Sequence, residues 1–286
     1  MRWDRDHESQ NLEDRRGQTP PMLGGGAGSA NLLWFVASRF GWKGIVVLLI
    51  GVAVVRGISA FTADDPQRAN SGSQGAATAS SDEHVRFVGF VFDDAQSFWE
   101  RTFRAATQLY TPARIVVFSD AVESACGNAS SAVGPFYCPR DERVFIDLGF
   151  YNELRDRFGA PGDFAQAYVL AHEMGHHVQH LTGRLDVSGD SVRTELQADC
   201  LAGVWAKDAE RRNLLEVGDI DEAMRAAAAI GDDRIQEQMT GHVRPETFTH
   251  GSAAQRLAAL RRGYTEGSAA ACDLSMFGES RSFNVK

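Results

Sequence analysis

Apolar side chains recur at helical spacing between Asp163 and Gly183. They fall three, four or seven positions apart, and they are Phe164, Ala167, Tyr168, Ala171, Gly175, Val178 and Leu181. Residues at these intervals share one face of an α-helix. Asp163 and Gln166 suit the N-cap and N3 positions of such a helix, and Gly183 suits its end. The pattern therefore predicts a helix between Asp163 and Gly183.

Less regular patterns predict further helices and two strands. The helices are expected at residues 94–109, 191–213, 219–241 and 252–262. The strands are expected at the short β-branched runs 114–118 (RIVVF) and 143–148 (RVFIDL). Because strands are few, the predicted fold class is α+β, mainly helical with a small sheet.

The first 61 residues differ in composition from the rest. Residues 1–41 are polar, with a Gly/Pro-rich stretch, and are expected to form a flexible tail. Between Lys43 and Arg56 lie twelve uncharged residues, which span about 18 Å as a helix, whereas the hydrocarbon layer is about 30 Å thick. If both basic side chains snorkel, residues 42–61 form one transmembrane helix with aromatic rings at each end. A buried core helix and a cleaved signal peptide are the alternatives, and the second is disfavoured because the run begins after residue 40.

Basic residues give this predicted span an orientation. The basic residues that precede the apolar run are Arg2, Arg5, Arg15, Arg16, Arg39 and Lys43. Only Arg56 and Arg68 follow it closely. The positive-inside bias therefore places residues 1–41 in the cytoplasm and the bulk of the chain outside it. Residues 62–81 have the Gly, Ser and Ala content of a linker, and residues 82–286 are expected to form one domain.

Charge and cysteine content restrict the function classes. The chain of 286 residues has a formal net charge of −9, so it lacks the basic excess that binds phosphate backbones, and a nucleic-acid partner is disfavoured. The cysteines are Cys126, Cys138, Cys200 and Cys272, and no two have the C-x₂-C spacing of a structural zinc site. We expect disulfides between Cys126 and Cys138 and between Cys200 and Cys272, with free buried thiols as the alternative.

The predicted helix from Asp163 contains the motif His172-Glu173-Met174-Gly175-His176. Two imidazoles four residues apart on a helix point the same way, about 6 Å from each other. They are then close enough to bind one Zn²⁺, and Glu173 beside them can reach a water on the metal. The alternative is a pair of hydrogen-bonded core histidines with a solvated glutamate.

A pair of acidic residues on the next predicted helix favours the metal site over that alternative. Glu195 and Asp199 lie four residues apart on the next predicted helix, so both face the same way. Glu195 is the expected third zinc ligand, and Asp199 is expected to accept a hydrogen bond from a ligand histidine. His177 points about 100° away around its helix, and His180 lies about 12 Å along the axis from the first histidine, so neither joins this set. Two histidines and one glutamate leave the fourth zinc position to water, as in catalytic sites.

With these motifs the chain resembles the family named "putative neutral zinc metallopeptidase" over nearly its whole length. The shared motifs include residues 1–3 (MRW), 9–17 (SQNLEDRRG), 126–127 (CG), 134–139 (GPFYCP), 172–176 (HEMGH), 195–205 (ELQADCLAGVW), 230–234 (IGDDR) and 249–252 (THGS). The resemblance implies a bacterial cell-membrane protein with a short cytoplasmic N-terminus, one membrane span and an extracytoplasmic zincin-like domain. It also implies that His172, His176 and Glu195 are the ligands and that Glu173 is the base.

Together these observations predict zinc-dependent peptide-bond hydrolysis of a peptide or protein substrate. One Zn²⁺ would activate a water from which Glu173, as general base, removes a proton. His250 is the first candidate to stabilise the oxyanion, ahead of Tyr137 and Tyr168, although it also fits as a residue that merely precedes the last helix. If the 143–148 strand is a sheet edge, it would bind extended substrate. The alternatives are an extracytoplasmic scaffold that uses zinc only for stability and a hydrolase of non-peptide amides.

Overall fold

The computed structural model describes residues 1–18, 71–185 and 191–273. The chain divides into two compact units, one of Met1–Gln18 with Ser80–Lys286 and the other of Thr19–Ala79. The predicted membrane span at residues 42–61 lies outside the described residues. Within the described ranges, no helix combines the length and the apolar character needed to cross a bilayer.

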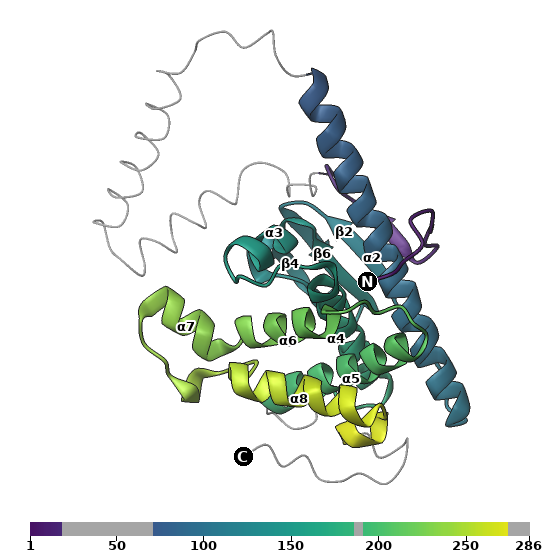
Figure 1. The fold of residues 1–286 in the computed structure, drawn as a ribbon, viewed down its shortest axis with the longest axis vertical. Coiled ribbons are helices and arrows are strands. Elements are labelled where there is room, and N and C mark those ends of the chain that lie inside the picture. Colours follow the sequence, from purple (N-terminus) through teal and green to yellow (C-terminus); the bar gives the residue numbers. More distant parts are fainter. Residues whose placement is uncertain (19–70, 186–190, 274–286) are drawn as a thin grey trace. The chain divides into compact units, whose positions relative to one another are not determined.

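The described helices and strands follow one another in an order that agrees with the mainly helical α+β class (Figure 1). They are β1 (Leu12–Asp14), α2 (Ser71–Ala105), β2 (Arg114–Phe118), β3 (Ala121–Ser124), β4 (Gly127–Ser130), β5 (Phe136–Cys138), β6 (Arg143–Asp147), α3 (Gly149–Asp156), α4 (Asp163–Leu181), α5 (Ser191–Arg211), α6 (Asp219–Ala229), α7 (Asp232–Thr240) and α8 (Ala253–Glu266). The two predicted strands are confirmed as β2 and β6.

Four of the strands form one sheet in the order β1-β2-β6-β5. The first three strands are parallel, and β5 pairs antiparallel with β6. The condition that residues 143–148 form a sheet edge is therefore not met, because β6 lies between β2 and β5. The edge strands are β1 and β5, and the three residues of β5 are too few to show an alternating pattern in the sequence.

Residues 1–18 belong to the folded domain, contrary to the expected flexible tail. Leu12 and its two successors pair with Ile115–Val117 of β2, and Met1 is buried. The amino group of Met1 donates to the carboxylate of Asp163 at 2.7 Å. The tail interpretation failed here because the few apolar side chains of this segment are diluted by polar ones in the sequence.

This arrangement also conflicts with the predicted membrane orientation. Residues 1–41 were expected in the cytoplasm and residues 82–286 outside it. Strands that share backbone hydrogen bonds cannot lie on opposite sides of a hydrocarbon layer about 30 Å thick. The pairing of β1 with β2 is therefore incompatible with a single bilayer crossing between them.

Helix α2 begins earlier than predicted. Residues 71–81 were expected to belong to the linker, but α2 starts at Ser71. The Ala, Ser and Gln of this stretch are compatible with a helix as well as with a linker. Farther along α2, one face enters the core through Phe87, Val88, Val91, Phe92, Ala95, Trp99 and Phe103.

The central element of the core is α4, which packs against both α5 and α6. Its predicted range is confirmed, but its first turn differs from the prediction. The N-cap is Gly162, and Asp163 is the first helical residue. The side chain of Asp163 therefore binds the Met1 ammonium group instead of capping its own helix.

The expected helix at residues 219–241 is divided into α6 and α7. The break lies at Ile230 and Gly231, where the loop before α8 comes close. A Cβ atom at Gly231 would overlap the backbone of Ala253, and the N–H of Asp232 donates to the carbonyl of Gly251 at 2.9 Å. The interruption coincides with this tertiary contact, and Gly231 followed by two aspartates is its local sign in the sequence.

Helix α8 lies directly against α5, with two glycines at the contact (Figure 1). A Cβ atom at Gly203 would overlap the carbonyl of Leu260, and one at Gly263 would overlap the carbonyl of Cys200. Both predicted disulfides are confirmed, Cys126–Cys138 and Cys200–Cys272. The second ties α5 to the end of the described C-terminal region.

Candidate metal centre

Helix α4 presents His172, Glu173 and His176 at one cleft. The two imidazole rings lie 4.8 Å apart, centroid to centroid, and are nearly perpendicular. His172 and Glu173 are each only 6% exposed. The cleft has a volume of about 730 Å³, and all three side chains line it. The four-residue spacing of the histidines thus produces the shared direction that the sequence predicted.

Glu195 reaches the same point from α5. Its Oε2 lies 3.0 Å from His172 Nε2 and 3.4 Å from His176 Nε2. The three potential ligand atoms all lie within 4.8 Å of one another. Ligand atoms of a tetrahedral zinc ion are separated by about 3.3 Å when its bonds are about 2.0–2.1 Å long. Two imidazole nitrogens and one carboxylate at these separations fit a single Zn²⁺.

The charges at this point favour a cation. Burial lowers the pKa of His172, but the carboxylates of Asp199 and Glu195 outweigh burial and raise it overall. Burial likewise lowers the pKa of His176, and Glu195 outweighs it. In Glu195, burial raises the pKa, but the two imidazoles reverse this and hold it well below its usual range. Without a metal the acids therefore retain protons on the histidines, and a bound metal would displace those protons.

Both histidines are oriented through their second ring nitrogen. The Nδ1–H of His172 donates to Asp199 Oδ1 at 2.8 Å, and that of His176 donates to Gln179 Oε1 at 2.8 Å. Carboxylate and amide oxygens only accept, so Nδ1 carries the proton and Nε2 is left for a metal. The position of Asp199 agrees with the predicted hydrogen bond. Gln179 was not foreseen, although its i+3 spacing from His176 on one helix is a usable signal.

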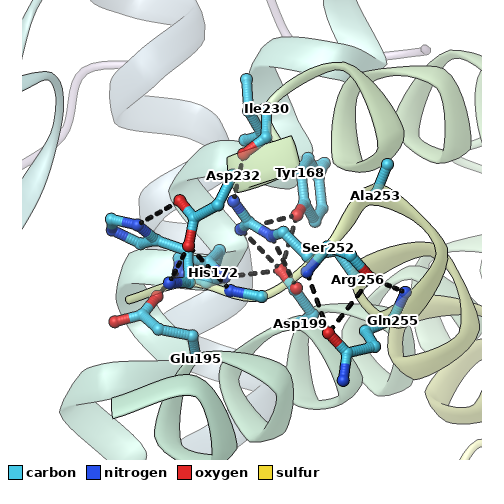
Figure 2. Close-up of polar contacts among 12 residues, drawn as sticks. Tyr168, His172, Glu195, Asp199, Ile230, Asp232, Ser252, Ala253, Gln255 and Arg256 are labelled. Carbon is cyan, nitrogen blue, oxygen red and sulfur yellow. Dashed lines mark hydrogen bonds and ion pairs between the residues drawn. The ribbon is translucent and has the colours of Figure 1, made fainter. Parts of the chain in front are cut away.

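Asp199 is the centre of a buried polar cluster, which Figure 2 shows. The carboxylate of Asp199 is completely buried and accepts from Tyr168 and Arg256 as well as from His172. Burial raises its pKa, but the charges of Arg256 and His172 lower it to about 2. Asp199 is therefore ionised, and the hydroxyl of Tyr168 is committed to it at 2.5 Å.

The remaining aromatic and histidine candidates are engaged elsewhere. His177 Nε2 donates to the carbonyl of Thr111 at 2.7 Å, so its Nδ1 accepts from the hydroxyl of Tyr137 at 2.9 Å. Burial lowers the pKa of His177 to about 4, which keeps this imidazole neutral. His180 Nε2 lies 3.8 Å from Glu142, and its ring centroid lies 6.1 Å from that of Tyr137. Neither histidine joins the ligand set, and Tyr137 is occupied by its contact with His177.

His250 also lines the cleft, from the loop that precedes α8. Its Nδ1 lies 2.9 Å from Thr249 Oγ1 and 3.3 Å from Asp232 Oδ1, and its side chain is 51% exposed. The backbone N–H groups of Thr249, His250 and Gly251 all donate to Asp232 Oδ2. The two motifs at residues 230–234 and 249–252 thus meet, and together they fix the loop that carries His250.

One wall of the cleft is apolar and includes the sheet edge. Its side chains come from β5, α3, the loop after α3 and α7, and they include Phe136, Phe150, Phe158, Ile235 and Met239. Met239 is 66% exposed. The cleft therefore combines a polar floor on α4 and α5 with an apolar side that is open to solvent.

The chain is similar to known bacterial proteins along nearly its full length. The model of the family described as "Putative neutral zinc metallopeptidase" matches residues 1–275. The "Uncharacterized protein YpfJ" of Escherichia coli (strain K12) is 39% identical over 297 residues, which cover 98% of this chain and 100% of that protein. The "Uncharacterized protein Rv2575" of Mycobacterium tuberculosis (strain ATCC 25618 / H37Rv) is 48% identical over 183 residues, or 57% of this chain and 62% of its own length.

No solved structure matches the chain. The family match includes both residues 1–18 and the helices that bear the candidate ligands, so it covers the folded domain that the structure describes. The chain belongs to the family described as "Putative neutral zinc metallopeptidase".

Proposed function

We propose that this protein hydrolyses peptide bonds with one Zn²⁺ held by His172, His176 and Glu195. The convergence of three ligand atoms within 4.8 Å at an open cleft carries the proposal. Two neutral imidazoles and one carboxylate leave a coordination position free, which is the arrangement of a catalytic rather than a structural zinc site. Bound zinc would supply a Lewis acid that polarises the carbonyl and lowers the pKa of water.

Glu173 is the general base in this proposal. It follows His172 directly on α4, lines the same cleft and is not one of the three ligands. Its carboxylate accepts a proton from the attacking water and later delivers it to the leaving amine. Only 6% of the residue is exposed, so the cleft limits its contact with bulk water.

His250 is the proposed donor to the oxyanion. Tyr168 is bound to Asp199 and Tyr137 to His177, so neither hydroxyl is available without breaking a contact. The Nδ1 of His250 faces Asp232 and Thr249, and within the described ranges its Nε2 has no polar partner. The hydroxyl of Thr249 can donate to Nδ1 at 2.9 Å, and Nε2 then carries the ring proton and would donate it to charge that develops in the cleft.

The proposed substrate is an extended peptide that adds to the edge strand β5. That strand pairs with β6 on one side only, so its other side offers backbone N–H and C=O groups. The neighbouring wall with Phe136, Phe150 and Phe158 would accept apolar side chains. The sequence analysis considered residues 143–148 for this role only if they form a sheet edge, and β6 is internal.

We also propose that the domain works outside the cytoplasm, at the bacterial cell membrane. Two disulfides in one domain are typical of oxidising compartments. Because residues 1–18 are part of the same unit, they would lie on that side too. A single crossing by residues 42–61 does not fit this placement, because it would put residues 1–18 and the domain on opposite sides. Contact of this run with the membrane stays a prediction from composition.

The test is a comparison of wild type with Glu173→Gln in the purified full chain. Zinc content is measured by mass spectrometry, and hydrolysis is measured on a peptide library with and without a chelator. We expect one zinc per chain in both proteins and a loss of at least about 100-fold in turnover in the variant. The amide keeps the shape of the side chain but cannot accept the proton.

The other outcomes are equally informative. Unchanged turnover in Glu173→Gln would refute the role of the base. A wild type that holds zinc but cleaves no peptide would support the scaffold alternative, and cleavage that survives the chelator would exclude the metal from the reaction.

A further inference from the structure

We propose that Arg256 is a positioning residue of the metal centre, acting on His172 through Asp199. The inference rests on the proposed zinc site but not on catalysis. Arg256 lies on α8, which carries none of the three ligands. Figure 2 shows its guanidinium group beside Asp199, with His172 on the far side of that carboxylate.

The Arg256–Asp199 contact is a double hydrogen bond in a dry environment. Nε donates to Oδ2 at 2.9 Å, and Nη2 donates to Oδ1 at 3.0 Å. The two side chains are 4% and 0% exposed. Two nearly parallel bonds between a planar guanidinium and a planar carboxylate fix the plane of the carboxylate as well as its position.

That plane determines where His172 points. Oδ1 of Asp199, which is held by Arg256, is also the atom that accepts the Nδ1–H of His172 at 2.8 Å. An imidazole ring is rigid, so fixing Nδ1 fixes the direction of Nε2 on its other side. This nitrogen faces Glu195 Oε2 at 3.0 Å, where the zinc ion is proposed to bind.

Arg256 is itself held from several sides. Nη1 donates to the carbonyl of Ile230 at 3.2 Å, and Nη2 lies 3.1 Å from the hydroxyl of Tyr168. Helix α8 packs closely against α5 at Gly203 and Gly263. Gly203 lies one helical turn from Asp199 on α5. The guanidinium therefore has little freedom to follow the carboxylate, so it can act as the fixed reference for Asp199.

Removing this reference leaves Asp199 as a buried carboxylate without its counter-charge. The side chain would then rotate, draw in water or displace α5, and each of these changes moves the acceptor away from His172 Nδ1. Loss of such an outer hydrogen bond lowers metal affinity or activity by about 10–100-fold in zinc proteins. Lysine at position 256 would restore one charge but not the double hydrogen bond.

The experiment compares wild type with Arg256→Met and Arg256→Lys, and with Arg261→Met as the matched control on an exposed part of α8. Zinc affinity of the metal-free full chain is measured by competition with a chelating dye. The visible absorption spectrum of the Co²⁺-loaded protein is recorded, because it reports the ligand geometry. Circular dichroism and thermal melting show whether each variant is folded.

We expect Arg256→Met to bind zinc about 10–100-fold more weakly and to show an altered Co²⁺ spectrum. The Arg256→Lys variant should be nearly as stable as wild type but should still bind zinc more weakly than wild type does. Arg261→Met should match wild type in both measurements. This pattern would separate a positioning role from a purely structural one, because a structural role predicts that affinity and stability recover together.

Two results would overturn the inference. One is a folded Arg256→Met protein with wild-type zinc affinity and spectrum. The other concerns the case in which Arg256→Met does not fold. An Arg256→Lys protein with the zinc affinity and the Co²⁺ spectrum of wild type would then overturn the inference. A wild type that binds no zinc would instead refute the proposed metal site, so the two failures are distinguishable.

Discussion

The three histidines at the cleft differ in how far the sequence alone predicts their surroundings. His172 and His176 lie on one helix, where 3.6 residues per turn fix their relative direction. The environment of His250 depends on Asp232, which is 18 positions earlier and on another helix. Such a contact is created only by the fold, so the sequence could nominate His250 but not its orientation.

The role of His250 leads to a prediction about turnover. His250→Gln should lower kcat by about 100-fold while leaving zinc content unchanged, because one donor to the oxyanion is lost and no ligand is touched. Steady-state kinetics on a cleaved library peptide measures the effect. His242→Gln, in an exposed loop, is the control and should behave as wild type. A kcat within twofold of wild type in His250→Gln would show that this imidazole only precedes α8.

The metal centre also contains one contact, between Arg256 and Asp199, that local sequence patterns could not predict. Glu195 and Asp199 were identifiable because an acidic i, i+4 pair on a second helix is a local pattern. Arg256 is 57 positions from its partner Asp199, and an arginine in an amphipathic helix is ordinarily a surface residue. Nothing in its neighbourhood in the sequence indicates burial, so its contact with Asp199 is visible only in the structure.

At the level of helices and strands, local patterns predicted most elements, and tertiary contacts set their limits. The ranges of α4 and α5 follow from their apolar periodicity. The break between α6 and α7 does not follow from periodicity; it falls at Gly231, where the loop before α8 approaches too closely for a side chain. The edge strand β5 also escaped prediction, since three residues carry too little pattern. These two features shape the cleft, so its apolar wall was the least predictable part of the site.

The two disulfides allow a prediction about stability. Cys126–Cys138 spans 12 positions and Cys200–Cys272 spans 72. In the loop-entropy model, the longer link restricts the unfolded chain more, by about 1.5 kcal/mol. Replacing Cys200 and Cys272 by serine should therefore lower the free energy of unfolding by about that much more than replacing Cys126 and Cys138. Urea denaturation of the two double variants measures the difference, and an equal loss in both would contradict the entropic argument.

For the whole molecule, the main feature is that β1, near the N-terminus, pairs with β2 about 100 residues later in the chain. Leu12 of β1 pairs with Ile115 of β2, although residues 19–70 lie between them outside the described ranges. Strands paired by backbone hydrogen bonds lie on the same side of any membrane. The composition of residues 1–41 gave no sign of this, because the positive-inside rule considers charges and not packing.

Chemical labelling tests this arrangement in cells. Asp6 and Glu266 are both exposed, one in the N-terminal segment and one on α8. In variants with cysteine at one position or the other, a membrane-impermeant maleimide should react equally before permeabilisation. The protein without an added cysteine serves as the background control. Reaction at only one of the two positions in intact cells would show that the segment and the domain are separated by a membrane.

The pairing of β1 with β2 also has a consequence for biosynthesis. The first strand leaves the ribosome about 100 residues before its partner, an interval of about 5–20 s at ordinary rates of translation. During that interval its backbone groups are unpaired and open to chaperones and proteases. The sheet can therefore close only after β2 has been made, and β1 depends on a partner about 100 residues farther along the chain.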